Sequence, residues 1–305
     1  MVGGIEMNTK KIKQSKVDVC FDIVNYILLA LLGVCFLYPL WFVCIASVSD
    51  PNEIWQGNVM LFPKGFTFAS YKQILKHSEI WTGYANSLFY TFAGTMISLA
   101  LTVSAAFPMS RKDFKARGFL MGLYTVTMFF SGGMIPAYLL VKSLNMIDTV
   151  WAILLPGSIS VYNVIVMRTY FSNSIPEELH EAASIDGCTN FRYLFRMVLP
   201  LSKSIIAVIA LFYGVAKWND YFSALIYLST RSKMPLQIFL RELLLQSQIT
   251  TEMTGTDTRW AAEQQKIAES IKYGIIVVAS IPTLVMYPFV QKHFVKGVMI
   301  GSVKA

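Results

Sequence analysis

The sequence predicts an all-α membrane protein that crosses the bilayer with six transmembrane helices. Only 14% of its 305 residues are charged, whereas a soluble chain carries about 25%, and its mean hydropathy is +0.52. The apolar residues form long runs with few or no charges, and a helix of about 20 residues spans the hydrocarbon core. Lipid permits only helices or closed barrels. Helices are favoured because the runs lack the alternation of barrel strands.

Six apolar runs define the predicted spans. They cover, in chain order, residues 23–49, 80–110, 118–141, 149–167, 204–230 and 273–291. The first is interpreted as a retained span, because bulky residues continue where a signal peptide would have a small-residue cleavage site. The third holds Gly132, Gly133 and Pro136, which either serve helix packing or form a kink that lines a pathway. A short helix is expected at 70–77, before the second span.

Basic residues near the span ends predict the orientation of the chain. Lys and Arg are more frequent in the segments that share a side with the N-terminus, and such segments stay in the cytoplasm. The N-terminal arm (1–20) and the C-terminal tail (294–305) are therefore expected to be cytoplasmic, with one membrane domain (21–293) between them. The net charge of +8 then reflects topology. Nucleic-acid binding is disfavoured, since no basic run is dense or interleaved with exposed aromatics.

A long loop at 231–272 is expected on the outer side. Residues 235–247 have the spacing of an amphipathic helix that could lie in the membrane interface. Asp257 or Thr258 is the predicted cap of a helix that leads into the last span.

The cytoplasmic loop 174–200 is charged and forms two predicted helices. Ser174 and Glu177 have the spacing of a capping box, and Gly187 is expected to end the first helix in a left-handed conformation. Asn190 is the predicted cap of the second helix, and Pro200 marks the start of the next span. Ala182 and Ala183 keep one face small, so that another protein could approach closely. The loop is therefore either a docking surface for a partner or an ordinary connection.

Polar and aromatic residues interrupt the fifth span. They are Tyr213, Lys217, Trp218, Asn219, Asp220 and Tyr221. Ionisable groups inside a membrane usually face a cavity or the protein interior. Lys217 and Asp220 are three residues apart, so they are expected to pair on one helix face. The segment either lines a translocation path or forms a structural ion pair at a subunit interface.

The spacing within loop 174–200 resembles a known motif. Glu181, Ala182 and Ala183 are followed by Gly187 and then by Leu199 and Pro200, which is similar to the EAA loop of ATP-binding-cassette (ABC) importer permeases. The one departure is Met197, where the family pattern has Ile. Segments 66–71, 131–136, 217–222 and 294–301 extend the resemblance over nearly the whole chain. They are most similar to the maltose-type second permease, in the Gram-positive subgroup for complex oligosaccharides and polyuronides.

This resemblance implies a type I ABC importer fold and a division of labour among subunits. The expected partners are a second permease, two ABC nucleotide-binding subunits, an extracellular sugar-binding lipoprotein and an oligosaccharide substrate. ATP and Mg are expected in the nucleotide-binding subunits, consistent with the lack of a G-x-x-x-x-G-K-[ST] loop here. The chain itself is expected to be a transport subunit without cofactor or enzymatic activity, in the plasma membrane of a bacterium.

The resemblance also assigns roles to residues and leaves alternatives open. Coupling to the ATPase is expected at Glu181, Ala182, Ala183, Gly187, Leu199 and Pro200, and the tail could reach the same subunits. Transport is expected to follow alternating access. Peptide or amino-acid cargo is an alternative, and so is a self-contained secondary carrier or intramembrane enzyme. The cysteines Cys20, Cys35, Cys44 and Cys188 have no metal or redox spacing, and no catalytic set is predicted.

Overall fold

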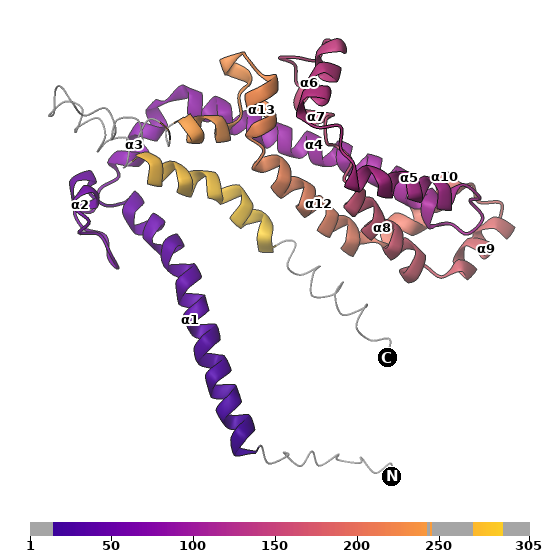
Figure 1. The fold of residues 1–305 in the computed structure, drawn as a ribbon, viewed down its shortest axis with the longest axis horizontal. Helices are drawn as coiled ribbons and strands as arrows, with labels where there is room; N and C mark the ends of the chain where they lie inside the picture. Colours follow the sequence, from indigo (N-terminus) through magenta and orange to yellow (C-terminus); the bar gives the residue numbers. More distant parts are fainter. Residues whose placement is uncertain (1–14, 243–244, 246–270, 289–305) are drawn as a thin grey trace.

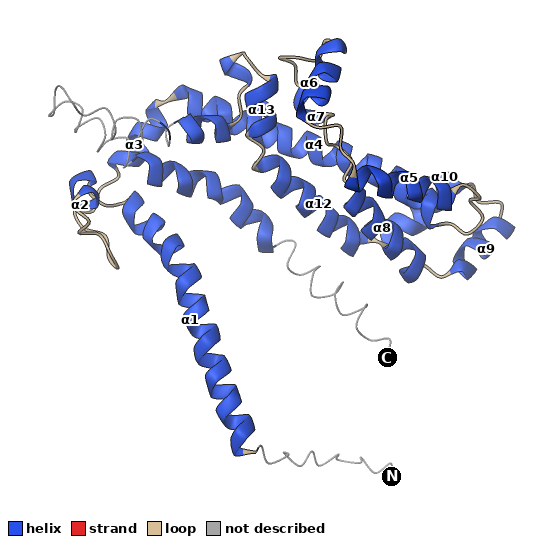
Figure 2. Ribbon diagram, viewed as in Figure 1, coloured by secondary structure: helices blue, strands red, loops and turns tan. Residues whose placement is uncertain are grey.

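The computed structural model describes residues 15–242, 245 and 271–288. This part of the chain is helical and contains no strand (Figure 2), which confirms the predicted all-α class. Three expectations lie outside the described residues: most of the N-terminal arm, the cap at Asp257 or Thr258, and the tail 294–305.

Figure 1 shows the elements in their order along the chain. In chain order they are α1 (Lys16–Ser47), α2 (Pro51–Trp55), α3 (Ala69–Lys76), α4 (Ser78–Ser110), α5 (Arg117–Phe129), α6 (Met134–Ser143), α7 (Trp151–Leu154), α8 (Val161–Ser174), α9 (Glu177–Ile185), α10 (Asn190–Tyr193), the π-helix η1 (Leu194–Val198), α11 (Leu199–Leu201), α12 (Lys203–Trp218), α13 (Phe222–Tyr227), the 3₁₀-helix η2 (Arg231–Lys233) and a last helix, Ile271–Pro288. The short helix predicted at 70–77 is α3.

Helix α4 is the centre of the bundle and packs mainly against α12 and α8. Its buried face repeats every three or four residues and includes Gly83, Gly94 and Ser98. A Cβ atom at Gly94 would lie 3.2 Å from the Lys217 side chain on α12. In lipid, small residues allow backbones to approach and gain van der Waals contact. The sequence of α4 therefore sets how closely its neighbours pack.

Helix α1 extends away from the other helices (Figure 1). The most apolar 18-residue window of this 32-residue helix has 0% of its residues buried, and only residues 45–47 are buried. There Ile45 and Ala46 pack with Ile54 and Val59. Near its end, Trp41 Nε1 also donates to Leu61 O at 2.9 Å, and the Phe42 ring meets the Tyr273 ring edge to face. Most of the remaining apolar surface of α1 is not covered by the described residues, so it is available to lipid or to another subunit.

The spans are less regular than the sequence predicts. Among the described residues, α1, α4 and the last helix are each long and apolar enough to cross a membrane. Two bent pairs, α5 with α6 and residues 190–201 with α12, raise the possible number to five. The span predicted at 149–167 is divided between α7 and α8, because Pro156 and Gly157 (φ +65°) interrupt the helix between them.

The break between α5 and α6 is made by glycine. The two helices differ in direction by 113°, and Gly133 has φ 85° and ψ 175°, a region that is essentially restricted to glycine. The sequence also suggested Pro136 as a source of a kink. Pro136 instead lies in the first turn of α6, where proline is tolerated.

The loop after α13 is fixed to the α6–α7 turn through Asp148. Its Oδ1 accepts hydrogen bonds from the backbone N–H groups of Ser229 (3.0 Å) and Thr230 (2.9 Å). Its Oδ2 accepts from the Thr230 hydroxyl and pairs with Lys233 Nζ at 3.1 Å. These bonds, first that from the Thr230 hydroxyl, hold the pKa of Asp148 well below its usual value. The end of the bundle opposite α9 is therefore tied together by polar contacts.

Candidate coupling site and translocation segment

Helix α9 ends at Ile185, and Gly187 forms the left-handed turn after it that the sequence predicts. Gly187 has φ +68°, and its N–H donates to Ser184 O at 3.1 Å. The next amide, of Cys188, donates to Ala183 O at 2.9 Å. This satisfies carbonyls at the helix end through a left-handed turn, which sends the chain back toward α10.

The side-chain caps predicted at the N-termini of the two helices in loop 174–200 are wrong. Ser174 is the last residue of α8, and α9 begins after Pro176 without a side-chain cap. Glu177 pairs instead with Lys112 on the α4–α5 connector, with 3.0 Å between Oε2 and Nζ. Thr189, rather than Asn190, caps the second helix. Ser174 does not cap α9, because it is still part of α8 and its backbone is helical.

The EAA residues divide between the two faces of α9. Ala183 is 3% exposed and packs inside the core formed by the ends of α4, α8 and α10. Glu181 and Ala182 are exposed. The expectation that both alanines face a partner is therefore corrected: Ala183 seats α9 on its own chain, and Glu181 and Ala182 remain accessible.

The three most exposed of the large apolar side chains in this loop were not predicted from the sequence. Ile185 on α9 is 86% exposed, Phe191 on α10 is 77% exposed and Phe195 on η1 is 63% exposed. Apolar residues in an otherwise polar loop were the available signal. Exposed apolar side chains that gather outside a lipid-facing helix are typical of a protein interface.

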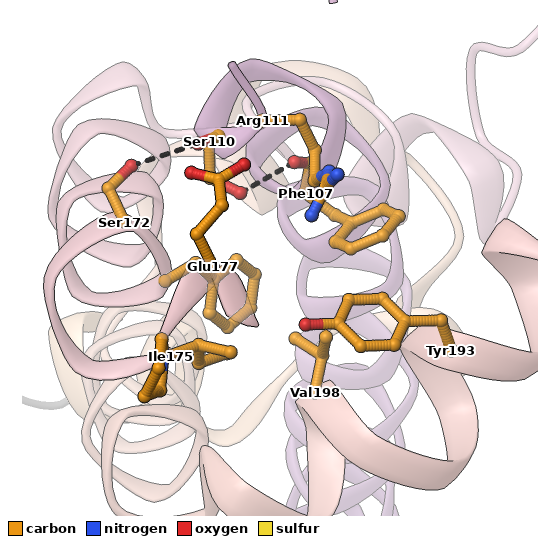
Figure 3. Close-up of a pocket in the computed structure, with 10 residues that line it drawn as sticks. Phe107, Ser110, Arg111, Ser172, Ile175, Glu177, Tyr193 and Val198 are labelled. Carbon is orange, nitrogen blue, oxygen red and sulfur yellow. Dashed lines mark hydrogen bonds between the residues drawn. The ribbon is translucent and has the colours of Figure 1, made fainter. Parts of the chain in front are cut away.

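A narrow seam lies where α9 and α10 meet the ends of α4 and α8 (Figure 3). A cavity of about 30 Å³ remains between α9, α10 and the ends of α4 and α8, which is room for little more than water. Ser172 on α8 donates to Ser110 O on α4 at 3.1 Å, and the Phe107 and Tyr193 rings are 6.3 Å apart. The seam is a packing contact between helices and has no space for a substrate.

Arg111 lies at the centre of the polar contacts beside this seam. Its Nη2 donates to His180 Nδ1 on α9, and its Nε lies 3.1 Å from Asp113 Oδ1. Partial burial would raise the pKa of Asp113, but the hydrogen bond and charge of Arg111 outweigh it and lower that pKa. The carboxylate is thus held ionised beside the guanidinium.

Leu199 and Pro200 lie where the chain turns into α12. Pro200 is exposed in the short helix α11, and the path of the chain bends by 84° between residues 190–201 and α12. Pro200 has no backbone N–H to donate to a helix. The π-helix η1, which has a wider turn, directly precedes α11. The span predicted to begin at Pro200 therefore starts after this bend, at Lys203.

Three of the six candidate pathway residues serve the interior of the chain. The Tyr213 hydroxyl lies 2.7 Å from Thr102 Oγ1 and accepts from the Ser160 N–H at 3.0 Å. Trp218 is 3% exposed, and its Nε1 donates to Ala279 O at 3.1 Å. Lys217 Nζ donates to Ile153 O at 3.0 Å. These contacts join α12 to α4, to the last helix and to α7.

The predicted ion pair between Lys217 and Asp220 does not form. Lys217 is directed toward α7, whereas Asp220 Oδ1 accepts from the Ser223 N–H at 3.0 Å and so stabilises the start of α13. The two side chains diverge because α12 ends at Trp218, so the three-residue helical spacing no longer applies.

Asn219 and Tyr221 are the candidates that remain at the surface. Asn219 is exposed and donates to Val215 O at 2.8 Å, one turn back on α12. Tyr221 is 42% exposed, with the Arg241 guanidinium 5.7 Å from its ring centroid. A path lined by this segment stays a prediction, and these two side chains are the ones placed to contact a substrate.

The described residues contain no group of three or more His, Cys, Asp and Glu side chains that could hold a metal. What this part of the chain offers is an apolar bundle, a seated helix with an exposed tip and a broken span.

Comparison with known proteins identifies the class. Residues 98–300 match the family described as binding-protein-dependent transport system inner membrane component, and the chain belongs to this family. It is 40% identical to Protein LplC of Bacillus subtilis over 284 residues, which is 93% of this chain and 95% of that protein.

Two further relatives agree over nearly the full length. The polygalacturonan/rhamnogalacturonan transport system permease protein YtcP of Bacillus subtilis is 39% identical over 93% of this chain and 98% of its own. A chain from the crystal structure of a bacterial ABC transporter involved in the import of the acidic polysaccharide alginate superposes with a TM-score of 0.84 at 32% identity, covering 93% of this chain and 100% of that one. The chain is therefore a multi-pass membrane protein with the fold of an ABC importer permease.

Proposed function

We propose that this chain is a permease subunit of an ATP-driven importer that moves oligosaccharides into a bacterial cell by alternating access. The observation that carries the proposal is the arrangement of α9: its Ala183 side packs against the bundle, while Glu181, Ala182 and Ile185 are exposed. A helix held in this way can receive a force from one side and pass it to the other.

The proposed assembly contains the subunits that such a permease needs for ATP-driven import. They are a second permease, two ATPase subunits that bind ATP and Mg, and an extracellular sugar-binding lipoprotein. The loop 174–200 docks on an ATPase subunit in the cytoplasm, and the N- and C-termini lie on that same side. The apolar surface of α1 that the described residues leave exposed is available to the second permease or to lipid.

Oligosaccharide cargo is supported by the names of several relatives. They include the YtcP protein named above, an arabinooligosaccharide permease of Halalkalibacterium halodurans at 26% identity and a galactooligosaccharide permease of Bacillus subtilis at 29% identity. Acidic cargo is favoured as the finer assignment, because the relatives with identity above 30% include proteins named for polygalacturonan and alginate transport.

Uptake tests this assignment. A strain that lacks the chain is compared with the same strain carrying it, using labelled oligogalacturonate, a neutral galactooligosaccharide and a tripeptide. Uptake of an oligosaccharide should depend on the chain and on ATP, with oligogalacturonate preferred. If uptake of the tripeptide alone depends on the chain, the cargo is a peptide and not an oligosaccharide. Uptake that persists in purified chain without ATPase subunits would point to a secondary carrier.

A further inference from the structure

Helix α9 is joined to its neighbours by non-helical backbone at both ends. At its start the backbone is extended at Ile175 (φ −109°, ψ 111°) and Pro176 (φ −60°, ψ 142°). At its end lies the left-handed turn at Gly187. A push on a nine-residue helix between two such joints can be lost as rotation of the helix. Efficient transmission therefore requires side-chain contacts that hold α9 against a longer element.

Arg111 supplies such a contact. It is the residue directly after α4, and 12% of its side chain is exposed. Its guanidinium donates to His180 Nδ1 in the first half of α9 and lies 5.9 Å from the centroid of the Tyr193 ring on α10. The His180 and Tyr193 rings meet edge to face at 5.1 Å. One cation thus touches both helices of the loop at the end of the 33-residue α4.

A second contact crosses the same joint but is weaker. Lys112 pairs with Glu177, with 73% and 33% of their side chains exposed. Exposed pairs of this kind contribute about 0–1 kcal/mol. Arginine is the better brace, because its planar fork has several fixed donors. It donates and never accepts, so His180 Nδ1 is the accepting nitrogen.

We propose that Arg111 is a positioning residue for energy coupling: through His180 it fixes α9 to the end of α4, so that displacement of α9 by an ATPase subunit moves α4. The sequence connects α9 only to α8 and, through α10, η1 and α11, to α12. The direct link to α4 exists through side chains alone. This inference rests on the proposed docking of the ATPase at α9.

The test uses the complete purified complex in lipid nanodiscs or liposomes and measures the ratio of substrate transported to ATP hydrolysed. Arg111→Met keeps the aliphatic bulk and removes the donors. His180→Leu removes the acceptor, and His180→Asn restores an oxygen near the position of Nδ1. Lys115→Met is the matched control, since Lys115 is an exposed cation on the same connector with no ion pair among the described residues.

Arg111→Met and His180→Leu should each lower the transport ratio by about tenfold, the scale of a hydrogen bond to a charged group. The double variant should be no worse than either single one, because both remove the same contact. His180→Asn should recover most of the ratio, and Lys115→Met should leave it unchanged. A normal ratio in both Arg111→Met and His180→Leu would overturn the inference.

Binding of the ATPase separates this inference from the function on which it rests. If ATPase subunits co-purify with Arg111→Met and His180→Leu as they do with the unaltered chain, a lowered ratio reports transmission. If both variants lose the ATPase subunits, Arg111 serves docking and the bracing role is rejected. If the unaltered chain binds no ATPase subunit, the proposed function itself fails.

Discussion

At the scale of single residues, loop 174–200 shows how local chemistry serves a larger task. Gly187 turns the chain because its φ of +68° is open to glycine at little cost. Ala183 is small enough to be buried at the seam. Glu181 is exposed to solvent. Its carboxylate therefore has no desolvation cost in the chain alone, and it would lose water only when a partner covers it.

Gly187→Ala should reduce ATP-driven uptake while the bundle stays assembled. A Cβ atom would meet nothing within 4 Å at this position, so the penalty is backbone strain alone, about 1–2 kcal/mol. Gly187→Asn is the matched control, because asparagine tolerates the left-handed region better than alanine. Transport by reconstituted complexes measures both. Equal transport by the two variants, at the unaltered level, would show that this turn is not required.

Trp218 and Asn219 should behave differently although they are neighbours. Trp218→Ala should lower the yield and thermal stability of the complex, since loss of a buried tryptophan costs about 3–5 kcal/mol. Asn219→Ala should leave stability unchanged and lower uptake, because its side chain is exposed and, among the described residues, donates to Val215 O one turn back and to no other group. Melting curves and uptake assays separate the two effects. Normal uptake with Asn219→Ala would remove this residue from the translocation path.

At the scale of elements, the close seams of α4 set the arrangement of the bundle. Near its start, Gly83 faces the segment after η2. There the Leu236 N–H donates to Ser87 Oγ at 2.9 Å, and Phe239 is buried. This seam joins parts of the chain that are about 150 residues apart in sequence.

Gly83→Ala should destabilise the protein by about 1–3 kcal/mol, the usual cost of overpacking. The new Cβ would lie 2.7 Å from the Phe239 ring and 3.2 Å from the Leu236 backbone nitrogen. Adding Phe239→Leu should recover part of the loss. Gly118→Ala on α5 is the control, because nothing lies within 4 Å of its added Cβ. Thermal unfolding of the purified complex gives the comparison, and equal melting temperatures for both glycine variants would contradict the seam.

The sequence predicted elements better than the joints between them. Long uncharged runs identify α1, α4 and the last helix because lipid demands uninterrupted helices. The breaks at Gly133 and Ser202 were harder to locate, since glycine, serine and proline also occur inside intact membrane helices. Gly187 was predicted because a left-handed turn has a strong local preference. The burial of Trp218 and Ala183 depends on neighbours far along the chain, which periodicity does not reveal.

At the scale of the whole molecule, the described part of the chain exposes apolar surface in two places, along α1 and around α9. Its most apolar long helix, α1, lies away from the bundle, and the large apolar side chains of Ile185, Phe191 and Phe195 are exposed around α9. Away from α9, Asp148 and its partners tie the loop after α13 to the α6–α7 turn. The proposed cycle follows from this asymmetry: a partner at α9 supplies motion, and the packed ends of α4, α8 and α12 carry it through the membrane.

Site-specific cross-linking at Ile185 tests the account most directly. Cys20, Cys35, Cys44 and Cys188 are first replaced, because all four are free thiols. A cysteine at Ile185, which is 86% exposed, is then compared with one at Ala183, which is 3% exposed. With a short bifunctional maleimide, Ile185→Cys should capture an ATPase subunit and Ala183→Cys should not. If Ile185→Cys captures no ATPase in the absence of nucleotide, with ATP or with ADP, α9 is not the docking site and the proposed coupling is wrong.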